Sequence, residues 1–175
     1  MQDSLKKSLK RDNIIYETPK ELAIDIINLI DFEDGDVVLD PCKGETVHPF
    51  YDNFPANVTK KWCEILLDVD FLQFDEPVDW IIGNPPFGKL LTNFIEHSAS
   101  LARKGIIFII PTHSYTYKRI KILGDADFHP YRVYLFTCWF GWPISVIIFK
   151  KGYNPIKKMK YEYKSPYDKH NNGKV

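Results

Sequence analysis

The feature that most restricts the fold of this 175-residue chain is an uninterrupted apolar run at residues 106–110, with the sequence IIFII. A strand with one solvent-facing side alternates polar and apolar residues, whereas a strand buried on both faces is apolar throughout. Strands of the second kind occupy the centre of parallel sheets that helices cover on both faces. The run therefore predicts a central strand of an α/β sheet.

Three helices are predicted from the spacing of apolar residues and from capping signals. Residues 18–30 begin with the capping box Thr18-Pro19-Lys20-Glu21 and continue with apolar residues at helical spacing. Residues 92–105 place apolar side chains on one face, with Thr92 as the cap and Gly105 as the stop. Residues 113–123 are the third candidate.

Five further strands complete the pattern. Residues 36–40, 60–66 and 78–83 predict short strands, and residues 133–137 and 145–150 predict a hairpin. Strands and helices that alternate before a closing hairpin favour a doubly wound, mostly parallel α/β sheet with an antiparallel edge.

The formal net charge of zero is the sum of unlike segments. Residues 1–11 carry +3, residues 150–175 carry +6, and residues 12–149 carry −9. Taken as a single number, the neutral total argues against nucleic acid as a partner, because phosphate binding usually shows as a basic excess. The two basic ends mean that zero net charge does not exclude nucleic acid. The basic ends are either solvated tails or segments that hold a nucleic-acid backbone on either side of the acidic body.

The sequence argues against a metal-binding protein, a membrane-spanning protein and a secreted protein. Three cysteines and five histidines are scattered without the paired spacing of metal ligands, so no metal site is expected. No apolar run reaches the length of a membrane span, and the N-terminus lacks the apolar stretch of a secretory signal. These patterns predict an intracellular protein, cytoplasmic or nuclear.

Polar residues at the ends of the predicted strands indicate a nucleoside-containing cofactor. Asp40 ends the first strand, just before the turn at Gly44, and Glu64 follows 24 residues after Asp40. In open α/β sheets ligands bind at the carboxyl ends of the strands, and an acid at about this spacing accepts hydrogen bonds from ribose. Asp70-Phe71 offers an acceptor and a ring for the base. No glycine-rich phosphate fingerprint follows the first strand, which favours a cofactor with one nucleoside and no phosphates.

The segment Asn84-Pro85-Pro86-Phe87 directly follows an apolar strand and indicates the chemistry. Its two prolines restrict the backbone, so the Asn84 side-chain oxygen and the Pro85 carbonyl can face one small volume. Two fixed acceptors suit an –NH2 group that is conjugated to a ring or a carbonyl. Phe87 adds a flat face for stacking.

These motifs resemble the Rossmann-fold, S-adenosylmethionine-dependent amino-methyltransferases, most closely the adenine-specific DNA methyltransferases. Asn84-Pro85-Pro86-Phe87 looks like their (D/N/S)-P-P-(Y/F) catalytic motif, and Tyr16-Glu17-Thr18-Pro19 looks like the upstream segment that closes over the methionine end of the cofactor. The γ-type motif order covers roughly residues 13–150. The resemblance implies these cofactor-binding residues: Tyr16, Thr18, Asp40, Pro41, Cys42, Lys43, Gly44, Glu64, Asp70, Phe71 and Asn84.

The resemblance also implies the reaction and the division of the chain. A class I methyltransferase domain would lie between a basic N-terminal segment (1–12) and a basic C-terminal tail (151–175). It would transfer a methyl group directly and in line from S-adenosylmethionine to the 6-amino group of adenine in DNA, or in RNA, on a flipped base. In this picture Asn84, Pro85, Pro86 and Phe87 are catalytic, and Phe87 also contacts the base. Trp139 and Phe140, in the connection of the predicted hairpin, either contact the base as well or form the hairpin's own hydrophobic cluster.

Two departures from the family pattern keep alternatives open. Asp40-Pro41-Cys42-Lys43-Gly44 looks like the family's first cofactor motif, but Thr46 stands where that motif has its second glycine. The roughly 25 residues after the domain are too few for a target-recognition domain. A protein partner or a homodimer would then supply target recognition. The alternatives are a protein methyltransferase that acts on a glutamine amide, and a catalytically silent subunit that binds nucleic acid or completes a partner enzyme.

Overall fold

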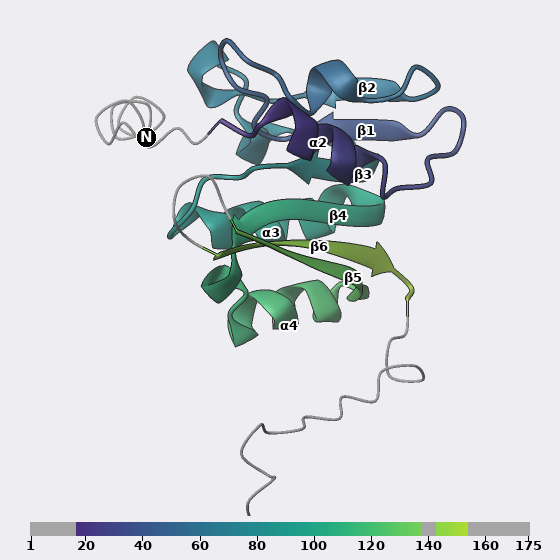
Figure 1. Ribbon diagram of the computed structural model, residues 1–175. Helices are drawn as coiled ribbons and strands as arrows, with labels where there is room; N and C mark the ends of the chain where they lie inside the picture. The colour runs from purple at the N-terminus through teal and green to yellow at the C-terminus, as the bar shows by residue number, and fades with distance from the viewer. Residues whose placement is uncertain (1–16, 138–142, 154–175) are drawn as a thin grey trace, which may run out of the picture.

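Six strands form a single sheet in the computed structural model, which describes residues 17–137 and 143–153 (Figure 1). Their order is β2-β1-β3-β4-β6-β5; β1 to β4 run parallel, and β6 is antiparallel to both β4 and β5. The predicted doubly wound, mostly parallel sheet with a C-terminal hairpin is confirmed. The strands are β1 (Val37–Asp40), β2 (Thr59–Trp62), β3 (Val78–Gly83), β4 (Ala102–Pro111), β5 (Phe128–Thr137) and β6 (Pro143–Lys151).

Helices cover both faces of this sheet, each through its own apolar core (Figure 1). Helix α2 (Lys20–Ile27) packs on one face through Ala23, Ile26 and Ile27. Helices α3 (Leu90–Leu101) and α4 (Tyr117–Asp125) pack on the other face. Apolar side chains on both sides of the strands therefore hold three layers together.

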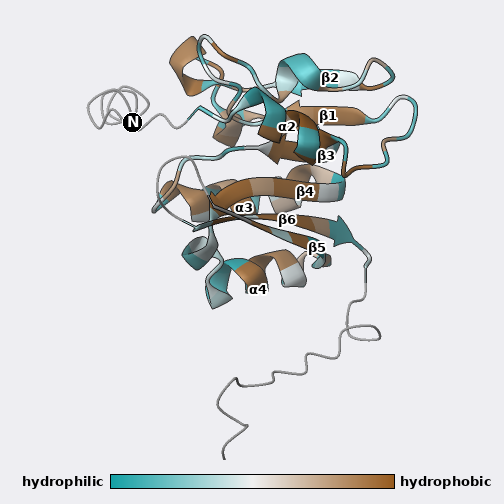
Figure 2. Cartoon of the chain, viewed as in Figure 1, coloured by the Kyte–Doolittle hydropathy of each residue, from teal (hydrophilic) through white to brown (hydrophobic). Residues whose placement is uncertain are grey.

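The predicted central strand is confirmed and begins earlier than expected. Every residue of β4 from Gly105 to Pro111 is buried, and Figure 2 shows most of the strand as hydrophobic. At the β2 edge the strand sequence is TKKW, which is polar enough to leave that edge in water.

The structure corrects three predicted boundaries. Helix α2 begins after Pro19 without a side-chain cap, so Thr18 is not the predicted capping residue. Thr92 lies inside α3 rather than at its start, and its hydroxyl accepts a hydrogen bond from Arg119 instead. Strand β2 ends at Trp62, since the Glu64 side chain accepts from the Leu66 amide and starts a short 3-10 turn (Ile65–Leu67).

Gly105 does not end α3 but lies inside β4, where it is required by packing. A Cβ at this position would lie 2.2 Å from Trp80 Cζ3 and 2.8 Å from the Phe149 carbonyl oxygen. The glycine therefore lets the Trp80 ring lie flat against the backbone of the neighbouring strand.

We expect Gly105→Ala to destabilise the fold by about 1–3 kcal/mol, because Trp80 and two strands must shift to admit the methyl group. Gly124→Ala is the matched control, since a Cβ there meets nothing within 4 Å and alanine favours a helix. Urea unfolding of both variants measures the difference. Equal stability of Gly105→Ala and the wild type would contradict the packing argument.

Candidate active site

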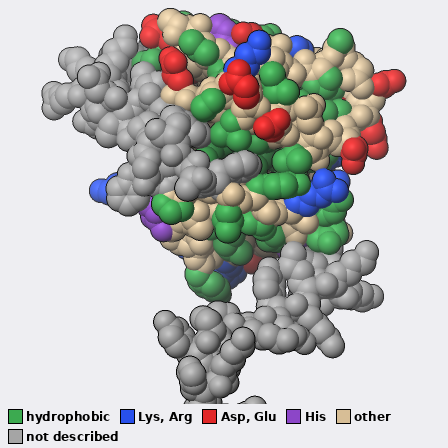
Figure 3. Space-filling model, in the orientation of Figure 1, with side chains coloured by type: hydrophobic (Ala, Val, Ile, Leu, Met, Phe, Trp, Pro, Cys, Tyr) green, Lys and Arg blue, Asp and Glu red, His purple; other side chains and the backbone are tan. Residues whose placement is uncertain are grey.

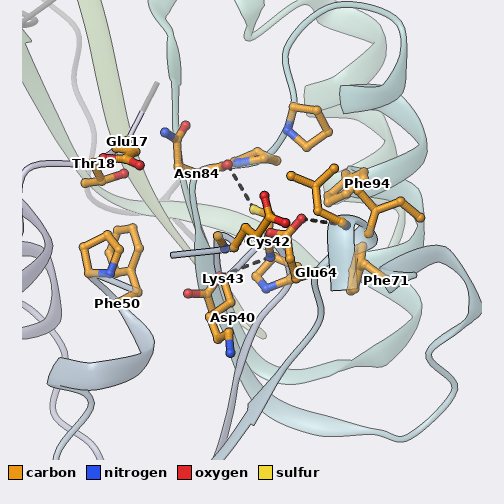
Figure 4. A pocket seen from close by; sticks show the side chains of 18 of the residues that line it. Glu17, Thr18, Asp40, Cys42, Lys43, Phe50, Glu64, Phe71, Asn84 and Phe94 are labelled. Atoms are coloured by element: carbon orange, nitrogen blue, oxygen red, sulfur yellow. Dashed lines mark hydrogen bonds between the residues drawn. The ribbon is translucent and has the colours of Figure 1, made fainter. Parts of the chain in front are cut away.

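A pocket of about 230 Å³ opens where β1 and β3 end (Figure 4). The parallel strands place the turn after Asp40 beside the loop that begins at Asn84, although 44 residues separate them in the sequence. The pocket brings together thirteen of the residues that the sequence predicted: Thr18, Asp40, Pro41, Cys42, Lys43, Gly44, Glu64, Asp70, Phe71, Asn84, Pro85, Pro86 and Phe87.

Three predicted site residues, Tyr16, Trp139 and Phe140, lie outside the described residues. The strand ends on either side of the hairpin connection, Thr137 and Pro143, pair with each other. The neighbouring β6 residue Ile144 pairs with Pro111 at the carboxyl end of β4. The described residues on both sides of the connection therefore lie at the edge of the sheet where β4 ends, and the roles of Trp139 and Phe140 stay predictions.

Asp40 is a buried carboxyl group in the pocket, with 1 % of its surface exposed. Burial raises its pKa to about 7, and the negative charge of Glu64 acts in the same direction. The Cys42 amide donates to Asp40 Oδ1 at 3.1 Å and favours the ionised form, but only in part. The side chain therefore changes charge near neutral pH and is poised to respond to a cationic ligand.

A second aspartate near the start of the same strand shows what a satisfied buried carboxylate looks like. Asp36 is also buried, but it accepts hydrogen bonds from Trp80 Nε1 at 3.0 Å and from Lys104 Nζ at 2.6 Å. Desolvation raises its pKa, but these partners and the Glu33 amide outweigh desolvation, so the pKa is lowered. Asp36 therefore serves the structure, whereas Asp40 lacks a comparable cationic partner within hydrogen-bond distance among the described residues.

Glu64 holds the turn of the first motif in place. Its Oε2 accepts from the Gly44 amide at 2.8 Å, and its Oε1 accepts from the Leu66 amide at 3.0 Å. Gly44 has φ +92°, and a Cβ there would lie 2.4 Å from the Val47 carbonyl oxygen, so the glycine is required. Each carboxylate oxygen accepts through more than one lone pair, so the proposed contact with ribose hydroxyls remains open to Glu64.

Asp70 and Phe71 are also fixed before any ligand arrives. Asp70 Oδ1 accepts from the Leu72 amide at 3.0 Å and caps a short turn (Phe71–Gln73). Phe71 is buried and packs on Phe94 of α3, with ring centroids 4.8 Å apart. The expected base-binding pair is thus held by a cap on one side and by an aromatic contact on the other.

A hydrogen bond joins the first motif to the Asn84 loop (Figure 4). Cys42 Sγ donates to the backbone carbonyl of Asn84 at 3.0 Å. Burial, with Asp40 nearby, raises the pKa of the Cys42 thiol well above its usual range, so the thiol keeps the proton that it donates. Burial also raises the pKa of Cys63 to about 12. Both thiols are therefore poor nucleophiles, in agreement with a direct transfer reaction.

Sequence reasoning missed part of the pocket wall and the environment of Lys43. Phe50 and Phe94 line the pocket, but each also belongs to an apolar core, so no pattern distinguishes them. Lys43 Nζ lies 3.8 Å from the ring centroid of Trp62, which belongs to the neighbouring strand β2. Such a cation–π contact depends on strand pairing and leaves no local signal.

The two ends of the described chain lie at opposite edges of the sheet. Glu17 and Thr18 line the pocket, whereas β6 is antiparallel to β4 and ends near Gly105, at the far edge. The end of β6 at Lys151 therefore lies away from the pocket. The predicted role of the two basic ends stays a prediction, because most of both segments lies outside the described residues.

Within the described residues, no group of three or more His, Cys, Asp or Glu side chains is arranged to hold a metal ion. In the same part of the chain, no helix has the length and apolar character that a membrane crossing requires.

No model of a known protein family matches the sequence, and no curated protein does. Solved structures do match the fold. Magnesium protoporphyrin IX methyltransferase from Synechocystis PCC 6803 with bound SAM aligns over 86% of this chain and 97% of its own, with TM-score 0.57 and 12% identity. This chain has the class I methyltransferase fold.

Two further structures with this fold differ in what their proteins act on. A tRNA methyltransferase of M. jannaschii aligns over 79% of this chain with TM-score 0.59 and 18% identity, and this chain spans about half of its length, 52%. An N1-methyltransferase of Burkholderia thailandensis, which carries 1,6-didemethyltoxoflavin and S-adenosylhomocysteine, aligns over 86% of both chains with TM-score 0.52 and 12% identity. Shared fold at this level of identity leaves the substrate open.

Proposed function

We propose that this chain is an S-adenosylmethionine-dependent methyltransferase that acts on the 6-amino group of adenine in DNA or RNA. The observation that carries the proposal is the single pocket in which the Asp40 and Glu64 side chains lie beside the Asn84-Pro85-Pro86-Phe87 loop. The part of the pocket with Asp40 and Glu64 suits the cofactor, and the part formed by the Asn84-Pro85-Pro86-Phe87 loop suits an amino group.

The donor set of the pocket fits this cofactor. Asp40, Glu64 and Asp70 supply carboxylates to a pocket with apolar walls, and such groups suit ribose hydroxyls, an adenine amino group and a cationic end. The cofactor, when bound, supplies an electrophilic methyl group on a positively charged sulfur. A related fold crystallised with bound SAM supports the assignment.

The chain's own contribution to the reaction is orientation. The lone pair of an aromatic amine is delocalised into its ring, so acceptors that draw on the N–H groups favour the geometry in which that lone pair is available. Asn84 Oδ1 and the Pro85 carbonyl are the proposed acceptors, and Phe87 is the proposed stacking face. Positioning and fixed dipoles then supply most of the rate enhancement.

The segments that follow β3 and β4 favour nucleic acid over a peptide. Residues 83–95 and 111–124, which follow β3 and β4, contain no Asp or Glu but include the exposed side chains Lys89 and Lys118. Tyr117 is 82% exposed beside Lys118 and offers a ring to a base. On the face shown in Figure 3, carboxylates gather instead over the upper half, around β1 and β2. Cationic and aromatic side chains in these two segments fit a polyanion, although the exposed carboxylates Glu17 and Glu45 line the pocket itself.

We expect Lys89→Glu/Lys118→Glu to raise the KM for nucleic acid at least about 10-fold. The slope of log KM against log salt should also fall by about 1–2, since each lost phosphate contact removes nearly one unit. The cofactor Kd should not change. The matched control is Arg103→Glu/Lys151→Glu, which makes the same charge change at the far edge of the sheet. If both double variants raised the KM and lowered the salt slope equally, the change in net charge alone would explain the result.

Transfer of labelled methyl groups from S-adenosylmethionine to separate pools of DNA, RNA and protein tests the proposed function. We expect label on N6 of adenine in one nucleic-acid pool. Label on glutamine in the protein pool would establish the amide alternative in its place. Absence of cofactor binding at millimolar concentration would favour the catalytically silent subunit. Adding a candidate partner protein to the same assay tests whether target recognition is supplied from outside the chain.

A further inference from the structure

Arg119, the third residue of α4, joins three separate elements through its guanidinium group. Nη2 donates to the Gly88 carbonyl at 2.7 Å, Nη1 donates to the Ser114 carbonyl at 2.7 Å, and Nε donates to Thr92 Oγ1 at 3.1 Å. Gly88 directly follows the 84–87 motif, Thr92 lies in the first turn of α3, and Ser114 ends the turn after β4.

The loop from Asn84 to Gly88 is therefore held at both ends from outside. At its start, the Asn84 carbonyl accepts from Cys42 Sγ, and at its end, the Gly88 carbonyl accepts from Arg119. The two prolines between them have no N–H with which to make backbone hydrogen bonds of their own. External contacts at the two ends thus carry much of the loop's orientation.

We propose that Arg119 is a positioning residue, which acts through the Gly88 carbonyl to fix the loop that carries the proposed acceptors Asn84 and Pro85. This inference rests on the proposed function. All three acceptors of Arg119 are neutral oxygens, so the guanidinium contributes direction rather than neutralisation of a carboxylate. A planar fork with five N–H donors can reach three elements at once, which a lysine ammonium on a flexible stem cannot do in the same geometry.

The test uses the full chain with Arg119→Ala, Arg119→Lys and the matched control Arg103→Ala, an exposed arginine at the far edge of the sheet. We expect Arg119→Ala to lower kcat about 10- to 100-fold, because small misplacements of reacting groups cost that much. The cofactor Kd should stay within about 2-fold of the wild type. Arg119→Lys should retain an intermediate kcat, and Arg103→Ala should match the wild type.

Hydrogen exchange of the free protein gives a second readout that does not depend on activity. Peptides over residues 84–92 and 112–117 should exchange faster in Arg119→Ala than in the wild type, and the α2 peptide should not change. Unchanged exchange in these peptides would mean that Arg119 does not hold the loop in place. If Arg119→Ala exchanged faster but kept a normal kcat, the positioning role would be overturned. If this variant lost cofactor binding and thermal stability together with kcat, Arg119 would have a structural role only. A wild type that transfers no methyl group would contradict the proposed function. The exchange comparison would still test whether Arg119 holds the loop.

Discussion

Replacing Asn84 by alanine should lower the kcat for methyl transfer by at least about 100- to 1000-fold while cofactor binding stays nearly intact. The expected loss is that of a hydrogen-bond group that acts on the reacting nitrogen in the transition state. Asn84 follows β3, and its backbone is held by Cys42 through the carbonyl rather than the side chain, so truncation should leave the loop in place. Single-turnover transfer of labelled methyl groups and calorimetry with S-adenosylmethionine separate the two effects.

Two further variants give this prediction its controls. Asn93→Ala removes an exposed amide from α3, nine residues away in the chain, and should transfer at the wild-type rate. Asn84→Asp retains a side-chain oxygen acceptor and should retain more activity than Asn84→Ala. If Asn84→Ala still turned over at a rate similar to Asn93→Ala, Asn84 would have no part in activating the amino group.

Asp40→Asn should make the protein more stable at alkaline pH and, at the same time, weaken its hold on the cofactor. The pKa of Asp40 is raised from 3.8 to about 7 in the folded chain, chiefly by burial. The stability that its neutral form contributes is therefore complete below about pH 4 and is lost as the pH rises through 7. The full loss amounts to at most about 4 kcal/mol. Asparagine retains the side-chain oxygen that accepts from Cys42 and does not ionise.

The comparison is made by urea unfolding at pH 5 and pH 8.5. The stability of Asp40→Asn relative to the wild type should increase by about 3 kcal/mol between these two values. Asp25→Asn, an exposed aspartate on α2, should show no such increase. A constant difference across the pH range would mean that Asp40 does not titrate near neutrality in the folded state.

Cofactor binding should change in the opposite direction. A cationic part of the bound cofactor favours the ionised form of Asp40, so wild-type affinity should rise as the pH rises through about 7. Asp40→Asn should bind at least about 10-fold more weakly at pH 8.5 and should lose this pH dependence. An unchanged Kd would remove Asp40 from the cofactor site while leaving its effect on stability intact.

Local patterns predicted most of the fold, because burial leaves a direct trace in the order of residues. Continuous apolar runs marked β3 and β4, and helical spacing marked α2 and α3. The boundaries were less accurate, since Gly105 has the composition of a helix stop but serves the packing of Trp80. In a sequence, a glycine that ends a helix looks the same as a glycine that lets another group pack closely against the backbone. Only the neighbouring strand, which carries Trp80, shows that Gly105 is of the second kind.

The candidate site, like the fold, could be predicted only in part from the sequence. The sequence alone determined which residues are the candidates for the site, because Asp40 ends a strand, Glu64 and Asn84 each follow one, and the carboxyl ends of parallel strands meet at one edge. Only the tertiary structure decided how these residues are held and charged. The pKa of Asp40 depends on burial, and the Asn84 loop depends on Cys42 and Arg119. Strand β6 ends at the far edge of the sheet because it is antiparallel to β4. These properties arise from contacts between residues distant in the sequence, and such contacts have no local pattern.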